Sequence, residues 1–253
     1  MAGSKTIIVT GASRGIGLAI SHHLLHQSHN LVVVARSAEP LEQLRAQYPS
    51  QVAVLAGDLA DFSLGAKAAE LAQKHWGGID GLIVNHGILD PVKRVSDVKA
   101  EEWRHLFDVN VFSGIAMVQA CLPALRESKG RIVLCSSGAA VGAYATWGAY
   151  GASKAALNHL ALTLSVEEPD VTTVSIRPGV VDTDMQVSIR EAHHKAMDEK
   201  DAAKFRELKE TGGLLRPDQP GNVMAKLALD APKELSGQFM SWNDEKLASF
   251  QDT

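Results

Sequence analysis

Short runs of aliphatic residues alternate with longer segments of helical periodicity along almost the whole chain. The runs fall at 6–10, 31–35, 52–56, 81–84, 131–136 and 171–176, and few polar residues interrupt them. Continuous apolar character indicates strands that are covered on both faces, as in a parallel sheet between two helix layers. The alternation therefore predicts an α/β fold with a doubly wound parallel sheet of about seven strands.

The segments between the runs have the length and periodicity of helices that cover such a sheet. We expect these helices at 16–26, 39–48, 63–75, 101–126 and 153–168, followed by a last helix near 220–229 and a last strand near 238–241. No internal repeat, low-complexity tract or linker interrupts the pattern. We therefore expect one domain over residues 1–253, a single-domain Rossmann fold.

The pattern changes near Asp184. From there to about Thr211 the chain is charged and helix-prone, and it then reaches Gly212 and Gly213. In a doubly wound fold, ligands bind beyond the carboxyl ends of the strands, where an excursion after the sixth strand would lie. We expect a helical substrate lid at about 184–213.

Charge and hydropathy exclude several classes of partner. The formal net charge of −4 at pH 7 gives no electrostatic basis for binding nucleic acid or an anionic membrane. The aliphatic runs are far shorter than the roughly 20 residues of a membrane span. The first residues lack the pattern of a signal peptide, and Cys121 and Cys135 have no metal or redox spacing. We expect a cytoplasmic protein with a small-molecule substrate.

A glycine-rich turn follows the first aliphatic run and leads directly into a helix. Gly11 allows a sharp turn, Gly15 allows the backbone to approach a pyrophosphate, and Gly17 allows the helix to pack on the strand. The helix N-terminus then presents free N–H groups to the phosphates. The turn predicts a dinucleotide site and reads Thr10-Gly11-Ala12-Ser13-Arg14-Gly15-Ile16-Gly17.

The end of the second run indicates which dinucleotide binds. An acidic residue at this place would bind the ribose 2′-hydroxyl of NAD, but Arg36 and Ser37 stand here and no acid occurs before Glu39. A guanidinium pairs with a 2′-phosphate, and Arg14 in the glycine turn approaches the same place. We predict NADP(H) as the cofactor.

A serine, a tyrosine and a lysine follow the fifth run. Tyr150 and Lys154 are four residues apart and share one face of a helix, and Ser137 stands at the strand end thirteen residues before the tyrosine. Reduction of a ketone needs hydride on carbon and a proton on oxygen, and a tyrosine supplies that proton. We expect Lys154, together with the positive ring of the oxidised nicotinamide, to lower the pKa of Tyr150 from about 10.

Taken together, these motifs resemble those of the short-chain dehydrogenase/reductase family over nearly the whole chain. The resemblance rests on the glycine turn, Asp58, Asn85-His86-Gly87, Asn110, Ser137, Tyr150, Lys154 and the segment Arg177-Pro178-Gly179-Val180-Val181-Asp182-Thr183. One departure is His86, where the family usually has a small residue.

The resemblance implies roles for residues that spacing alone leaves open. It implies that Asp58 contacts adenine, that Asn110 holds a water for proton relay, and that Thr183 binds the carboxamide. The catalytic set it implies is Asn110, Ser137, Tyr150 and Lys154. The cofactor set is Gly11, Ser13, Arg14, Gly15, Ile16, Gly17, Arg36, Ser37, Asp58, Leu59, Asn85, Gly87, Tyr150, Lys154, Pro178, Gly179, Val181 and Thr183.

Within this family the chain is similar to fungal benzil reductases and, more distantly, to sepiapterin reductases. The likeness implies an NADPH-dependent carbonyl reductase of ketones or 1,2-diketones, with Tyr150 as general acid. Two alternatives remain: an NADP-dependent secondary-alcohol dehydrogenase and a catalytically idle NADP(H)-sensing regulator. The closer likeness is carried by 90–93, 136–139, 155–159 and 178–183.

Two aromatic residues precede Tyr150 in a loop expected to reach the active edge. Either core packing or an aromatic substrate pocket accounts for Tyr144 and Trp147. The pocket interpretation adds five apolar residues, so that its members are Leu89, Ala139, Val141, Tyr144, Trp147, Met185 and Ile189.

Two further features concern metals and assembly. His22 and His26 have a spacing that fits a metal, but no carboxylate accompanies them, so a solvated helix face and no metal site are expected. The helices at 101–126 and 153–168 are long with aliphatic faces, and family members build dimers and tetramers with the equivalents. We expect a homodimer or a homotetramer.

Overall fold

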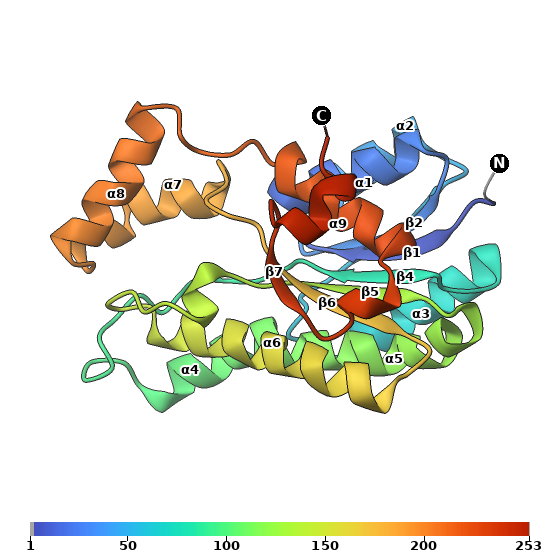
Figure 1. Ribbon diagram of the computed structural model, residues 1–253, viewed down its shortest axis with the longest axis horizontal. Helices are drawn as coiled ribbons and strands as arrows, with labels where there is room; N and C mark the ends of the chain where they lie inside the picture. Colours follow the sequence, from blue (N-terminus) through green and yellow to red (C-terminus); the bar gives the residue numbers. More distant parts are fainter. Residues whose placement is uncertain (1–2, 253) are drawn as a thin grey trace.

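The six aliphatic runs and a seventh strand form one parallel sheet in the computed structural model, which describes residues 3–252 (Figure 1). The strand order is β3-β2-β1-β4-β5-β6-β7, and every neighbouring pair is parallel. The order reverses between β1 and β4, which creates a crevice at their carboxyl ends. The strands are β1 (Thr6–Thr10), β2 (Asn30–Ala35), β3 (Val52–Ala56), β4 (Gly81–Val84), β5 (Arg131–Cys135), β6 (Thr172–Arg177) and β7 (Phe239–Ser241).

Helices cover both faces of the sheet, as the alternation predicts. In Figure 1, α1, α2 and α9 lie on one face, and α3, α5 and α6 lie on the other. The doubly wound single domain is confirmed. The helices are α1 (Gly15–His26), α2 (Ala38–Gln47), α3 (Ser63–Trp76), α4 (Ala100–Phe107), α5 (Ser113–Ser128), α6 (Gly148–Glu167), α7 (Asp184–Glu191), α8 (Glu199–Glu210) and α9 (Asp218–Asp230).

Each strand sends alternate side chains into two separate cores. In β1, Ile7 and Val9 pack into the core under α1 and α9, whereas Ile8 packs into the core under α3, α5 and α6. All three side chains are fully buried. Successive side chains point to opposite faces of a strand, so a strand covered on both sides is apolar over most of its length.

The long helix expected at 101–126 is interrupted. A π-helical turn, Asp108–Phe112, separates α4 from α5 and carries Asn110. The combined stretch Ala100–Ser128 is apolar and long enough to cross a bilayer, but half of its most apolar part is buried inside the protein. The other difference is that α6 begins at Gly148 rather than at 153, so Tyr150 and Lys154 lie on one helix.

The charged excursion forms α7 and α8, which project from the sheet between β6 and α9 (Figure 1). It leaves and rejoins the domain at one point, because Leu215 donates to the Val180 carbonyl at 2.9 Å and accepts from the Asp182 N–H at 2.8 Å. Its inner side buries Ile189 and Phe205. The excursion is therefore amphipathic, although its sequence reads as polar.

Removing a core side chain tests this packing. Leu82 is fully buried in the centre of β4, so Leu82→Ala should lower the free energy of unfolding by about 2–5 kcal/mol. The midpoint of urea unfolding, followed by circular dichroism, measures the loss. Val95→Ala is the control: Val95 is 72% exposed, and its change should stay within about 0.5 kcal/mol. Equal losses in both variants would contradict the two-core arrangement.

Candidate active site

One cavity of about 500 Å³ opens at the carboxyl ends of the strands. The glycine turn, the ends of β2, β4 and β5, the start of α6 and both excursion helices contribute to its wall. The cavity runs from the sites expected for adenosine to those expected for catalysis. Its wall contains these members of the expected cofactor set: Gly11, Ser13, Arg14, Gly15, Ile16, Arg36, Ser37, Asp58, Leu59, Asn85, Gly87, Tyr150, Lys154, Pro178, Gly179, Val181 and Thr183.

The glycine turn has the close approaches that a pyrophosphate cradle requires. A Cβ on Gly17 would lie 2.1 Å from the Gly11 carbonyl oxygen and 2.7 Å from Asn85 Nδ2, so no other residue fits there. Gly17 itself stays beneath the cavity wall. Gly15 has φ +54°, and a Cβ there would lie 3.1 Å from Cγ2 of Thr183. The bare backbone at the N-terminus of α1 therefore fits a dinucleotide phosphate.

Arg36 and Ser37 line the adenosine end of the same cavity. Arg14 is engaged elsewhere: its guanidinium lies 2.8 Å from the Asp184 carboxylate at the start of α7, and both side chains are largely exposed. This ion pair links the glycine turn to the excursion across the cavity. Of the two arginines, only Arg36 has no ion-pair partner among the described residues.

Tyr150, Lys154 and Ser137 meet in the inner part of the cavity. Lys154 Nζ donates to the Cys135 carbonyl at 2.8 Å and lies 5.8 Å from the centre of the Tyr150 ring. Ser137 Oγ accepts from the Ala139 N–H at 3.1 Å, which leaves the serine hydrogen free to be donated. Two hydrogens of Lys154 also remain available.

Burial, rather than Lys154, controls the pKa of Tyr150 in this structure. Removal from water raises that pKa, the neighbouring Cys135 adds to the rise, and a hydrogen bond with Ser137 opposes it. Burial likewise lowers the pKa of Lys154. The expected lowering of the Tyr150 pKa concerns the complex with the oxidised cofactor, in which the positive nicotinamide ring acts together with Lys154, and it stays a prediction.

Asn110 lies beneath the cavity rather than in its wall. Its Oδ1 accepts from the Ile88 N–H at 2.8 Å, and its Nδ2 donates to the Ile88 carbonyl at 2.9 Å and to Ser153 Oγ at 3.1 Å. The amide thus clamps the loop after β4 against α6. The π-helical turn places this residue, since inserting one residue in a helix re-aims the side chains that follow.

His86 is a nearly buried member of the cavity wall and joins three neighbouring elements. Its Nε2 lies 3.0 Å from the Val109 carbonyl and 2.6 Å from Ser113 Oγ, and its Nδ1 lies 2.7 Å from Thr10 Oγ1. A carbonyl only accepts, so Nε2 carries the hydrogen in the neutral ring, and Nδ1 accepts from the threonine hydroxyl. Burial, with a smaller effect of Lys154, lowers the pKa of His86 to about 4.

The aromatic residues before Tyr150 line the cavity beside that tyrosine. Trp147 stacks on Phe205 of α8 with ring centres 5.6 Å apart, and the ring centre of Tyr144 lies 4.7 Å from that of Trp147. Ala139, Met185 and Ile189 join them in the cavity wall.

Two residues of the expected substrate pocket lie outside the cavity wall. Leu89 is buried behind the wall among the same apolar side chains. Val141 is 72% exposed, because it follows the short helical turn Gly138–Ala140 that returns the chain to the surface.

The sequence interpretation missed several residues of the wall. Phe205, with Ala202 three residues earlier and Leu208 three residues later, follows a helical spacing that marks an apolar face of α8. This spacing could have identified the apolar face of α8 from the sequence. The remaining residues had no such signal, because the fold brings them together from two loops, α4, the π-helical turn, α7 and α8; they include Ile88, His105, Val109, Val180, Gln186 and Lys204.

Comparisons with known proteins agree with this arrangement. A model of the short chain dehydrogenase family matches residues 5–194. An uncharacterised oxidoreductase of Saccharomyces cerevisiae is 42% identical over 250 residues, which cover 97% of this chain and 98% of the relative. A benzil reductase of the same yeast, described as forming (S)-benzoin, is 43% identical over 261 residues, covering 98% of this chain and 99% of that protein. The crystal structure of a yeast short chain dehydrogenase/reductase superposes with a TM-score of 0.97 at 41% identity, covering 98% of this chain and all of that one.

The buried imidazole predicts an acid-sensitive contribution to stability. The pKa of His86 is about 4 in the folded protein and about 6.5 when unfolded, so the unfolded chain takes up the proton first as the pH falls. Between pH 7 and pH 4 this group should remove about 3 kcal/mol of stability. Denaturant titrations of wild type and His86→Gln at both pH values isolate the effect, and the variant should lose correspondingly less. The same loss in both proteins would show that other groups cause it.

Proposed function

The chain belongs to the short-chain dehydrogenase family, and on that premise we propose that it is an NADPH-dependent carbonyl reductase of ketones and 1,2-diketones. One observation carries the proposal: Tyr150, Lys154 and Ser137 share a cavity whose other end contains Arg36 and Ser37. A proton donor and a site for a 2′-phosphate therefore belong to one continuous space.

The catalytic residues divide the work of reduction among them. The bound nicotinamide would supply a hydride to the carbonyl carbon. Tyr150 donates its phenolic proton to the carbonyl oxygen, and its raised pKa keeps it protonated at neutral pH before reaction. Ser137 donates a hydrogen bond to the same oxygen, which in comparable sites is worth roughly 3 kcal/mol. The product is a secondary alcohol, and the tyrosinate regains its proton from solvent.

Lys154 and the glycine turn hold the cofactor for this step. One hydrogen of Lys154 is taken by the Cys135 carbonyl, so the other two face the cavity and suit the nicotinamide ribose hydroxyls. Asn110 keeps the loop after β4 in place, and Thr183 stands opposite Gly15 at the ring end.

Aromatic substrates fit the outer part of the cavity. Tyr144, Trp147 and Phe205 form a group of packed rings there, and offset stacking favours aryl groups. Their position beside Tyr150, together with similarity to the yeast benzil reductase, supports an aryl ketone or aryl 1,2-diketone as substrate. Oxidation of a secondary alcohol is the reverse of the same reaction.

The excursion of α7 and α8 is proposed as the lid of this cavity, since its inner side supplies Met185, Ile189 and Phe205 to the wall.

We also propose a homodimer or a homotetramer, because Phe112, Leu162 and Val166 expose apolar side chains on the α5 and α6 side of the sheet. The two buried free thiols fit a cytoplasmic location.

Turnover tests the proposed reaction directly. Wild type should oxidise NADPH in the presence of benzil, and Tyr150→Phe should reduce kcat by at least about a thousandfold because the proton donor is gone. Loss of nicotinamide absorbance gives the rate, and fluorescence titration should show that the variant still binds NADPH. Retained turnover in Tyr150→Phe would refute the role of the tyrosine. No turnover of benzil, an aryl monoketone or an aliphatic ketone by wild type would favour the cofactor-sensing alternative.

Arg36 should determine the choice between the two nicotinamide cofactors. In Arg36→Ala, a charged hydrogen bond to the 2′-phosphate is lost, so kcat/KM for NADPH should fall by roughly 10- to 100-fold while that for NADH changes little. Steady-state rates with each cofactor, at a fixed benzil concentration, give the two kcat/KM values. Arg45→Ala, an exposed arginine on α2 that pairs with Glu42, is the matched control. A parallel fall with NADH would mean that Arg36 does not read the 2′-phosphate.

A further inference from the structure

A nearly buried glutamine belongs to the part of the cavity wall that α7 and α8 supply. Gln186 is only 6% exposed and belongs to the cavity wall, on the same helix as Met185 and Ile189. Burying an amide in such surroundings is unfavourable unless hydrogen bonds compensate. The partners of this amide therefore indicate what it does.

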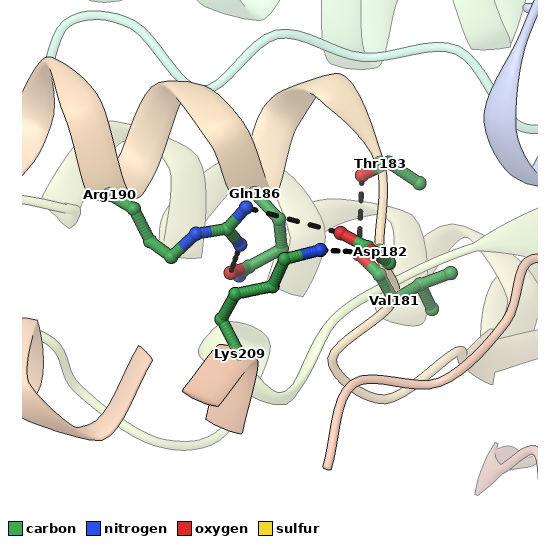
Figure 2. Close-up of polar contacts among 6 residues, drawn as sticks. All are labelled: Val181, Asp182, Thr183, Gln186, Arg190 and Lys209. Atoms are coloured by element: carbon green, nitrogen blue, oxygen red, sulfur yellow. Dashed lines mark hydrogen bonds and ion pairs between the residues drawn. The ribbon is translucent and has the colours of Figure 1, made fainter. Parts of the chain in front are cut away.

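One half of the amide is already engaged. Arg190, one helical turn further along α7, donates from Nη1 to Gln186 Oε1 at 3.2 Å (Figure 2). Rotation of the amide by half a turn would place its NH₂ group against the guanidinium, donor against donor. Arg190 therefore holds the carbonyl oxygen of Gln186 toward itself.

The other half of the amide is free. Within residues 3–252, no protein group hydrogen-bonds to Gln186 Nε2, and this atom is not among the fully enclosed polar atoms that lack a partner. It therefore keeps accessible surface. Gln186 is nearly buried and belongs to the cavity wall, so we assign this surface to the cavity. The amide then offers the cavity an unpartnered N–H donor, while its carbonyl oxygen accepts from Arg190.

Asp182 holds Arg190 in this position. Its carboxylate lies 4.0 Å from Arg190 Nη2 and accepts from Lys209 Nζ at 2.8 Å, so it links the ends of α7 and α8 (Figure 2). Its backbone N–H donates to the Leu215 carbonyl at 2.8 Å, where the excursion rejoins the domain. The orientation of the Gln186 amide thus depends on both lid helices and on the loop after β6.

We propose that Gln186 is a specificity-determining residue, whose Nε2 donates a hydrogen bond to a second oxygen of the substrate, next to the carbonyl that is reduced. Arg190 and Asp182 are positioning residues for this amide. The inference rests on the proposed carbonyl reductase function and narrows its substrate class to 1,2-dicarbonyl compounds. This hydrogen bond thereby distinguishes a diketone from a monoketone of similar shape.

Matched pairs of substrates isolate this hydrogen bond. Benzil and benzyl phenyl ketone differ at one carbon, which is a carbonyl in the diketone and a methylene group in the monoketone. The pair 1-phenyl-1,2-propanedione and propiophenone differs in the same way. The two members of a pair differ in intrinsic reactivity, so the measured quantity is the diketone-to-monoketone ratio of kcat/KM in each variant relative to wild type. For a monoketone that turns over too slowly, its inhibition constant against benzil replaces kcat/KM.

Gln186→Met keeps the length of the side chain and removes the donor. We expect kcat/KM for both diketones to fall by roughly 3- to 10-fold, the value of one neutral hydrogen bond, and the monoketone values to stay within about twofold of wild type. Gln186→Glu reverses the polarity: Arg190 pairs with its carboxylate, which offers only acceptors to the cavity. Its diketone-to-monoketone ratio should fall below that of Gln186→Met.

Two further variants separate positioning from structure. Arg190→Met frees the amide to rotate and should move the ratio toward that of Gln186→Met. Val187→Met changes an outward-facing residue of the same helix, 36% exposed, and should leave the ratio unchanged. NADPH affinity, measured by fluorescence titration, should be the same in every variant.

Two results would overturn the inference about Gln186. One is an equal loss for diketones and monoketones in Gln186→Met, and the other is weakened NADPH binding, which would assign the amide to the cofactor. Both are separable from failure of the proposed function, which would appear as a wild-type protein that reduces neither diketone.

Discussion

Burial of a parallel sheet on both faces is the constraint from which the rest of this structure follows. All seven strands run in one direction, so all their carboxyl ends meet at the same edge, and helices block both faces of the sheet. A ligand therefore has access only at that edge and at the reversal between β1 and β4. The glycine turn after β1, the serine after β5 and the loop after β6 gather there because each directly follows a strand.

The same burial sets the protonation states of the site. Low polarity raises the pKa of Tyr150 and lowers the pKa of Lys154 and His86, so each group is displaced toward its neutral form. A protonated phenol is the form that reduction of a carbonyl requires. Binding of a charged cofactor would change this balance, since a positive nicotinamide ring stabilises a tyrosinate.

The excursion of α7 and α8 combines two kinds of contact. It buries apolar side chains such as Ile189 and Phe205, and ion pairs join Arg14 to Asp184 across the cavity and Arg190 and Lys209 to Asp182. Exposed ion pairs contribute little stability individually, so the apolar contacts carry most of the packing of this segment. On the inner side of this segment, Phe205 packs against Trp147 and contributes an aromatic surface to the cavity.

The sheet, the glycine turn and the pair Tyr150 and Lys154 could be predicted from the sequence, because these features depend on local spacing. Strand bounds at Thr6–Thr10, Val52–Ala56 and Gly81–Val84 match the aliphatic runs, since a strand buried on both faces is mostly apolar. The fold and family were likewise predictable. Three features became visible only in the folded structure: the outward position of Val141, the ion pair of Arg14 and the orientation of the Gln186 amide. These features depend on which side chains from distant segments meet, and on the cost of burying their charges, which no spacing along the chain records.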